Sequence, residues 1–275
     1  IFPLHTWQPD TYEQAPTATT MVLSGVMVKM GVFGMVRWLF PVVTGASFQW
    51  GDFITLLSVI GMIYASLIAL RQDDLKRLVA YSSIAHIGLL CAGMFTQNAF
   101  GIQGVMIQMF SHGINIIGLW IVVEWIERNT GTRKISELGG LAQTAPVLTF
   151  FLVIIALANI ALPLTNAFVG EFLIFNGILS SYTKYYVWFT LMAGICIIIG
   201  AVYMLGMIRK VAYGNVNELT ARVVDIKFIE KLALGVIVAL ILWVGIYPQP
   251  MLNLTSDLTD SLINKFEVLR HVVPK

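Results

Sequence analysis

Four ionisable residues interrupt long apolar stretches of this chain: Lys29, His86, His112 and Glu171. Lys29 lies 13 residues after Pro16 and 8 residues before Arg37. These separations are roughly 20 Å and 12 Å along a helix, too far for a lysine side chain to extend easily to either end. Because a charge at the centre of a membrane helix costs at least about 2.5–3.5 kcal/mol, a lysine there predicts a function. We interpret Lys29 as an amine that takes up and releases protons; the alternative is a lysine that reaches the membrane surface.

The two histidines lie at similar depths in their own stretches. His86 is 10 residues past Lys76 and His112 is 14 residues past Asn98, which is roughly 15 Å and 21 Å along a helix. Each has polar neighbours that can hold water: Tyr81, Ser82 and Ser83 near one, Gln108, Ser111 and Asn115 near the other. Because imidazole exchanges protons near neutral pH, the pair predicts a hydrated proton relay. The alternative is two histidines that only pack in the interior, and no cluster with metal-ligand spacing predicts a metal site.

Glu171 follows Gly170 shortly after a predicted helix break at Pro163–Asn166. Proline removes a backbone donor and clashes with the preceding turn, and broken membrane helices expose backbone groups where transporters bind ions. We interpret Glu171 as a titrating site. The alternative, which is compatible with it, is a carboxylate that caps the second half-helix.

The composition requires a membrane around these residues. Of the 275 residues, 57% are hydrophobic and only 12% are charged, with a mean hydropathy of +0.81. A water-facing surface needs roughly a quarter to a third of charged residues, so a soluble enzyme and a disordered tail are excluded. The net charge of +2 and the two isolated cysteines also exclude a nucleic-acid binder and a disulfide-rich secreted module.

The fold class that follows is an all-α polytopic membrane protein with about seven transmembrane helices. A span needs about 20 mostly apolar residues. The predicted spans lie near residues 17–36, 53–70, 78–95, 99–123, 141–181, 185–208 and 232–246, within a bundle over residues 17–248. The fifth span is too long for one straight helix and is predicted to be discontinuous at the proline.

Basic residues orient the spans. One face receives eleven of them: Arg71, Lys76, Arg77, Arg128, Arg133, Lys134, Arg209, Lys210, Arg222, Lys227 and Lys231. The other face receives five: Arg37, Lys184, Lys265, Arg270 and Lys275. This asymmetry predicts that the first face is cytoplasmic. Glu124 lies four residues from Arg128 and is expected to pair with it.

The tail, residues 249–275, is predicted to be an amphipathic helix on the outer surface or against a partner. Apolar residues recur in it at helical spacing: Leu254, Leu258, Leu262, Phe266 and Leu269. Asp257 and Asp260 come early and Lys265 and Arg270 late, an order that suits the helix dipole.

Several motifs make the chain resemble the antiporter-like subunits of respiratory complex I. They are Pro3-Leu4-His5-Thr6-Trp7-Gln8-Pro9-Asp10, Ala15-Pro16-Thr17-Ala18 with Lys29, Asp74-Leu75-Lys76-Arg77-Leu78-Val79-Ala80-Tyr81-Ser82-Ser83 with His86-Ile87-Gly88, Gln108-Met109-Phe110-Ser111-His112-Gly113, and Phe168-Val169-Gly170-Glu171-Phe172. They occur in order over residues 1 to 172. Glutamate at position 171, where sister chains usually carry lysine, favours one type of chain within this family.

The resemblance implies two inverted five-helix bundles, each with a broken helix, joined by a line of buried ionisable residues. It assigns Lys29 to the central lysine, His86 and His112 to the hydrated histidines, and Glu171 to the second broken helix. His5 matches a histidine in the loop of the first broken helix, whose end would occupy residues 1–16. The family's first-bundle glutamate and lysine would lie before Ile1, so the chain is expected to cover only about the C-terminal half.

The function implied is proton translocation in the bacterial inner (plasma) membrane, coupled to distant oxidation of NADH and reduction of quinone. Two cysteines are too few to ligate an iron–sulfur cluster. Flavin, iron–sulfur clusters and quinone are therefore expected in partner chains, which would include sister antiporter-like chains and other membrane and redox subunits. Contact with lipid is expected and contact with nucleic acid is not. The alternatives are a subunit of a multi-subunit cation/proton antiporter or membrane-bound hydrogenase, and a passive membrane scaffold.

Overall fold

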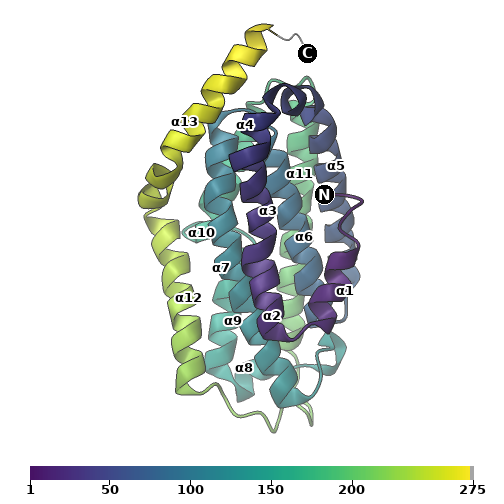
Figure 1. The fold of residues 1–275 in the computed structure, drawn as a ribbon. Helices are drawn as coiled ribbons and strands as arrows, with labels where there is room; N and C mark the ends of the chain where they lie inside the picture. Colours follow the sequence, from purple (N-terminus) through teal and green to yellow (C-terminus); the bar gives the residue numbers. More distant parts are fainter. Residues whose placement is uncertain (273–275) are drawn as a thin grey trace.

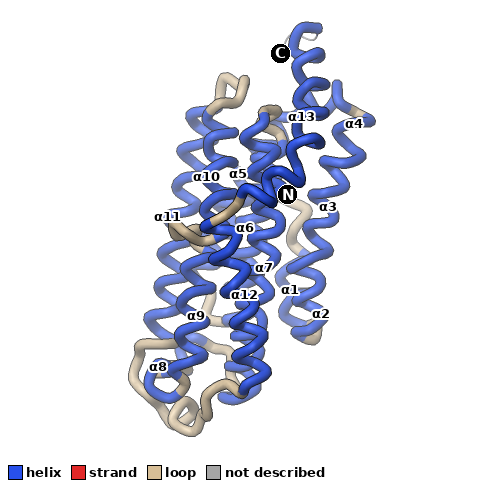
Figure 2. Tube along the Cα trace, turned by 90° about the vertical axis from the view of Figure 1, so that its left-hand side faces the viewer, coloured by secondary structure: helices blue, strands red, loops and turns tan. Residues whose placement is uncertain are grey.

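The computed structural model describes residues 1–272, which form a bundle of helices without strands (Figures 1 and 2). The elements are α1 (Trp7–Gln14), α2 (Thr17–Val22), η1 (Leu23–Met27), α3 (Val28–Gly34), η2 (Met35–Leu39), α4 (Phe40–Val42), α5 (Thr44–Arg71), α6 (Leu75–Met94), α7 (Ala99–Thr130), η3 (Ile135–Glu137), α8 (Leu141–Thr144), α9 (Pro146–Asn159), α10 (Asn166–Leu179), α11 (Tyr186–Val211), α12 (Phe228–Ile246) and α13 (Gln249–Val272). Elements α2 to α4 form one rod, Thr17–Val42, that contains two π-helical turns.

Within the described residues, six helices are long and apolar enough to cross a membrane, the rod included. The shorter apolar helices α9 and α10 follow one another and form the discontinuous span. Most helices extend past the sequence windows; α5, for example, begins at Thr44 instead of residue 53. The windows stop at the first charged residue, but a helix continues to the interface because its backbone groups must stay hydrogen-bonded, and charged side chains there reach water.

The break between α9 and α10 occupies residues 160–165. Ala161 and Leu164 adopt left-handed backbone conformations there, with φ of 56° and 75°. Helix α12 passes directly against this turn, because a Cβ atom on Gly245 would lie 2.2 Å from the Leu164 carbonyl oxygen. Only glycine allows this approach, so α12 supports the break from outside.

Glycines also bring α7 and α10 together along their length. A Cβ atom on Gly104 would lie 2.7 Å from the Ile174 nitrogen, and one on Gly177 would lie 2.5 Å from the Gly101 nitrogen. Small residues that let backbones approach are typical of packed membrane helices. The two helices that carry His112 and Glu171 are therefore held at close range.

The tail helix α13 runs obliquely at the upper end of the bundle (Figure 1). Its apolar side contacts the bundle itself: Leu262 and Phe266 are buried, and the Phe266 ring lies 5.7 Å from that of Phe40. The helix is amphipathic as predicted. The side chains of Leu269 and Arg270 and the last three residues of the predicted tail, Lys275 included, lie outside the described part.

The loops rich in basic residues meet at the lower end of the bundle in Figure 1, and we call this end the basic end. Hydrogen bonds join them: Ala142 N–H donates to the Ala212 carbonyl, and the Asn217 side chain donates to the Glu137 carbonyl. The Thr132 hydroxyl and the Lys134 ammonium hold the pKa of Glu137 below its usual range.

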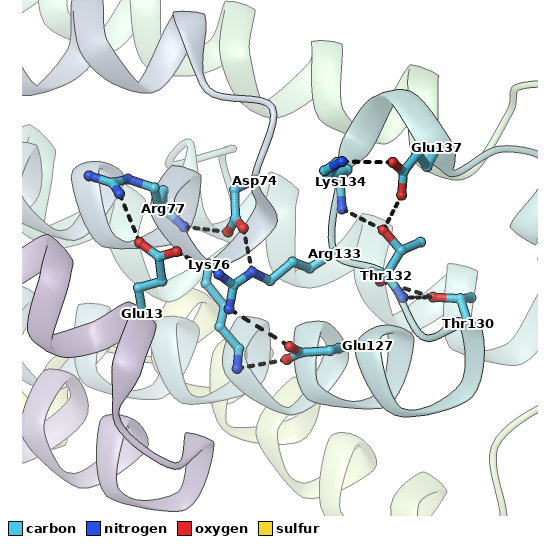
Figure 3. A network of polar contacts seen from close by, with 10 residues as sticks. All are labelled: Glu13, Asp74, Lys76, Arg77, Glu127, Thr130, Thr132, Arg133, Lys134 and Glu137. Atoms are coloured by element: carbon cyan, nitrogen blue, oxygen red, sulfur yellow. Dashed lines mark hydrogen bonds and ion pairs between the residues drawn. The ribbon is translucent and has the colours of Figure 1, made fainter.

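A network of ion pairs at the basic end attaches α1 to α6 and α7 (Figure 3). Glu13 on α1 accepts from Arg77 at 2.8 Å and also pairs with Arg133. Arg133 in turn binds Asp74, the N-cap of α6, whose carboxylate accepts the Arg77 backbone N–H. Lys76 pairs with Glu127 of α7 at 2.6 Å. The network fixes the ends of three helices relative to one another.

Candidate functional site

A buried acid–base pair lies in the middle of the bundle. The Glu171 Oε1 atom is 3.3 Å from His86 Nδ1, and it accepts a hydrogen bond of 3.3 Å from Gln108 Nε2. The Glu171 residue is only 4% exposed. The pair brings together α6, α7 and α10, so a proton placed on either group is shared between helices.

Glu171 reaches this position because α10 approaches α7 closely. A Cβ atom on Gly170 would lie 2.5 Å from Gln108 Oε1. Just after the break, the Asn166 side chain donates to the Ser111 carbonyl, and the Ser111 hydroxyl donates to the Asn166 carbonyl. The carboxylate contacts His86 of α6 and Gln108 of α7. The N-terminus of α10 has no side-chain cap, so the interpretation of Glu171 as a helix cap is not supported.

His112 extends the pair toward the rod. Its ring centroid lies 4.9 Å from that of His86, and the residue is 1% exposed. Neither ring nitrogen of His112 has a hydrogen-bond partner within the described structure. Since a buried polar atom without a partner is costly, these two nitrogens are positions that favour a water molecule.

Lys29 lies on α3, directly after the π-helical turn η1. Its Nζ atom donates to the Ser24 carbonyl within its own rod, and the residue is 8% exposed. It borders an apolar groove against α7, together with Met109 and Gly113. The lysine is therefore buried beside the helix of His112, although no direct contact joins the two side chains. The alternative in which it extends to the membrane surface does not fit this burial.

His5 lies apart from the other predicted residues. It is 5% exposed, and its ring contacts are with Phe2 and with Tyr64 of α5, at 5.7 Å and 5.3 Å between centroids. Its Nδ1 atom has no partner. The structure thus brings His86, His112 and Glu171 into one cluster with Lys29 next to it, and leaves His5 at a distance.

A cavity borders the acid–base pair on the side of α11. Its walls include His86, Glu171, Asn159, Ser66 and Tyr203. It offers about 30 Å³ to the centres of water molecules, and since one water needs about 10–15 Å³ by that measure, it has room for about two.

Sequence reasoning missed Asn159 and Tyr203. Asn159 is the last residue of α9, and its amide donates to the Ser82 hydroxyl at 3.1 Å. An amide directly before a helix break could have been recognised as a candidate. Tyr203 lies in an apolar run, where an amphipathic side chain gives no distinct pattern.

One predicted contact is wrong. Glu124 accepts from the Thr17 hydroxyl, and Arg128 pairs with Glu230 of α12. Partners from neighbouring helices replace the expected pairing within α7. Among the described residues, no group of three or more His, Cys, Asp or Glu side chains could hold a metal ion.

Comparison with known proteins points to the same family of antiporter-like membrane subunits. Residues 1–206 match the family described as NADH:quinone oxidoreductase/Mrp antiporter, transmembrane region. The chain is 38% identical over 267 residues to NADH-quinone oxidoreductase subunit M of Rickettsia felis, covering 97% of this chain and 53% of that protein. It is 34% identical to NADH-ubiquinone oxidoreductase chain 4 of Marchantia polymorpha, covering 96% and 52%.

A solved structure has the same fold. Respiratory complex I from Thermus thermophilus contains a chain that superposes with a TM-score of 0.90 at 26% identity, over 96% of this chain and 55% of that one. The chain thus spans about half the length of the relatives it matches. The type of chain favoured by Glu171, subunit M and its mitochondrial counterpart chain 4, is the one these relatives represent. With a family match over most of its length, the chain belongs to the NADH:quinone oxidoreductase/Mrp antiporter family of membrane proteins.

Proposed function

We propose that this chain moves protons across a membrane as part of a subunit M of NADH–quinone oxidoreductase. The observation that carries the proposal is the buried pair of Glu171 and His86, in contact with a His112 ring whose nitrogens have no partners. A buried pair of this kind holds a proton in either of two places with little movement of atoms. The adjacent helix break and cavity leave room for the water that would carry protons to it.

In this mechanism Lys29, His86, His112 and Glu171 act as successive proton sites. Lys29 gives or takes a charge next to α7, water connects it to His112, and the two neighbouring imidazoles, tilted by 54° to one another, pass the proton to Glu171. Each group gains one proton and loses one, so the chain returns to its starting state after each cycle. His5, which lies outside the cluster, is proposed to have at most an indirect role.

The redox chemistry would take place elsewhere. We propose that partner chains hold the flavin, the iron–sulfur clusters and the quinone, and that this chain sits beside other membrane subunits, sister antiporter-like chains among them. The expected location is the bacterial inner membrane, with the basic end on the cytoplasmic side because of its excess of Lys and Arg.

The test is the variant His112→Asn in the full-length subunit and the assembled complex. Inverted membrane vesicles are energised with NADH, and acidification of the lumen is followed by fluorescence quenching. Asparagine keeps a polar group but does not exchange protons, so pumping is expected to fall while assembly stays normal. A passive scaffold predicts native pumping. A cation/proton antiporter predicts instead that proton movement depends on added Na⁺ and not on NADH.

A further inference from the structure

Two cavities meet at Tyr203 of α11. The first is the central cavity beside the Glu171–His86 pair, and Tyr203 forms part of its wall. The second lies toward the basic end between α5, α6 and α11, and its lining includes Gln72, Arg209, Lys210 and again Tyr203. Tyr203 therefore lies between the cavity beside the buried acid–base pair and the second cavity, mostly apolar in its lining, that reaches Gln72, Arg209 and Lys210 near the basic loops.

The Tyr203 hydroxyl belongs to a buried polar chain. It donates to the Ser82 hydroxyl at 3.0 Å, and Ser82 also accepts from the Asn159 amide at 3.1 Å. The three residues are 5%, 0% and 2% exposed. The side-chain oxygen Oδ1 of Asn159 has no partner although the residue lines the central cavity. Since buried polar atoms are normally paired, this oxygen is a position where a water molecule in the cavity is stabilised.

The opposite side of the acid–base pair is packed mainly with apolar side chains. Between it and the upper end of the bundle in Figure 1, the packed interior is made of side chains that are almost fully buried, namely Leu89, Leu90, Met94, Ile102, Ile174 and Ile178. Buried polar side chains occur on this side too, among them Thr55, Ser58 and Thr96, but none of these three lines the central cavity. The central cavity instead shares Tyr203 with the second cavity, which lies toward the basic end.

Two glycines of α11 leave space around Tyr203. A Cβ atom on Gly200 would lie 3.7 Å from the Tyr203 oxygen, so the ring is turned back toward the central cavity. A Cβ atom on Gly206, which lines the second cavity, would meet nothing within 4 Å. The ring therefore lies toward the central cavity, with free space on the side of Gly206.

We propose that Tyr203 is the gate of a water route that connects the basic end of the bundle with the Glu171–His86 pair. Its ring separates the two cavities, and its hydroxyl supplies the hydrogen-bonding link through Ser82. The proposal rests on the proposed function, because it gives the direction from which the buried pair exchanges protons. The access route itself is a property of the resting protein and is measurable without turnover.

A native cysteine reports on this route. Cys196 lines the central cavity, whereas Cys91, which is also buried, does not. Silver ions are small, do not cross lipid readily and replace the thiol proton to form a silver thiolate. The experiment adds Ag⁺ to inverted or right-side-out vesicles that contain the full-length subunit in its complex, without NADH. The fraction of Cys196 protected from later alkylation is then measured by mass spectrometry.

We expect Cys196 to react at least about tenfold faster from the side of the basic end, with Cys91 as an unreactive internal control. Tyr203→Ala should open the passage and raise the Cys196 rate by about tenfold. Gly206→Leu should fill the second cavity and lower the rate, while Gly194→Leu, a matched change on the same helix at a position with no neighbour within 4 Å, should leave it unchanged.

Equal reaction from both sides, faster reaction from the side away from the basic end, or a Gly206→Leu rate equal to that of the native protein would overturn the proposal. The measurement on the native chain alone decides the side of access, so the result does not depend on the variants folding. Pumping by Tyr203→Phe is a separate readout. If Cys196 of this variant still reacts from the side of the basic end and pumping is unchanged, the route is retained and the hydroxyl is rejected as its link. If Cys196 reacts faster from the side of the basic end and His112→Asn pumps like the native protein, the proposed function is contradicted and the access route is not.

Discussion

The contact between Glu171 and His86 makes a quantitative prediction possible. For opposite unit charges at the observed 3.3 Å, an effective dielectric constant of about 20 gives an attraction of about 5 kcal/mol. Moving one charge through 100 mV costs about 2.3 kcal/mol. When both groups are charged, their attraction therefore exceeds the work done against such a potential.

The perturbation is Glu171→Gln. The amide oxygen can still accept from Gln108 and His86, so the packing of α10 is retained, but the negative charge and the exchangeable proton are lost. The charged form of His86 loses about 5 kcal/mol of attraction, and the relay is interrupted at this step. Since positioned acid–base groups contribute roughly 10²- to 10⁴-fold to proton transfer, we expect pumping to fall by at least about tenfold.

The assay is the initial rate of lumen acidification in inverted vesicles, normalised to the amount of assembled complex on a native gel. Glu218→Gln is the matched control, since this glutamate is exposed in the loop between α11 and α12. We expect the control to pump like the native protein. A Glu171→Gln complex that assembles and pumps at the native rate would refute the electrostatic argument and move the proton path away from α10.

Three further outcomes are expected. A thiol in Glu218→Cys should react with an impermeant reagent only from the cytoplasmic side and one in Asp260→Cys only from the other side; the reverse pattern would invert the assigned orientation. Lys29→Ala and Lys29→Arg should both assemble and lose pumping, because alanine carries no charge and guanidinium does not release its proton, and native pumping by either would remove Lys29 from the relay. Gly245→Ala should lower stability by about 1–3 kcal/mol because its methyl group overlaps the break between α9 and α10. Thermal unfolding of the purified subunit measures this, with Gly235→Ala as the unstrained control on the same helix; equal melting of the two variants would contradict the close contact.

Long apolar runs made the spans predictable, because a helix is the segment that satisfies its backbone groups within lipid. The break was predictable from Pro163 in a run too long for one span. The residue types of the site were also predictable, because a lysine or glutamate stands out in an apolar run. Their mutual distances were not, because the approach of Glu171 to Gln108 depends on a glycine contact between two helices.

The predicted partner of Glu124 shows the limit of local rules. Spacing of four residues places two side chains on one helix face, but the structure pairs Arg128 with Glu230 from α12. A residue 102 positions away in the chain cannot be ranked above a neighbour from the sequence alone. Tyr203 was missed for a related reason, since its role depends on two cavities that several helices create together.

The ion pairs at the basic end have a consequence for the order of events during synthesis. Glu13 leaves the ribosome 64 residues before Arg77 and 120 residues before Arg133. Its two partners are therefore absent while the rod Thr17–Val42 and α5 are being inserted. The ion pair of Glu13 with Arg77 can form before α7 is synthesised, whereas the ion pair with Arg133 can form only after α7. The same charges thus serve first as orientation signals during insertion and afterwards as the ion pairs that complete folding.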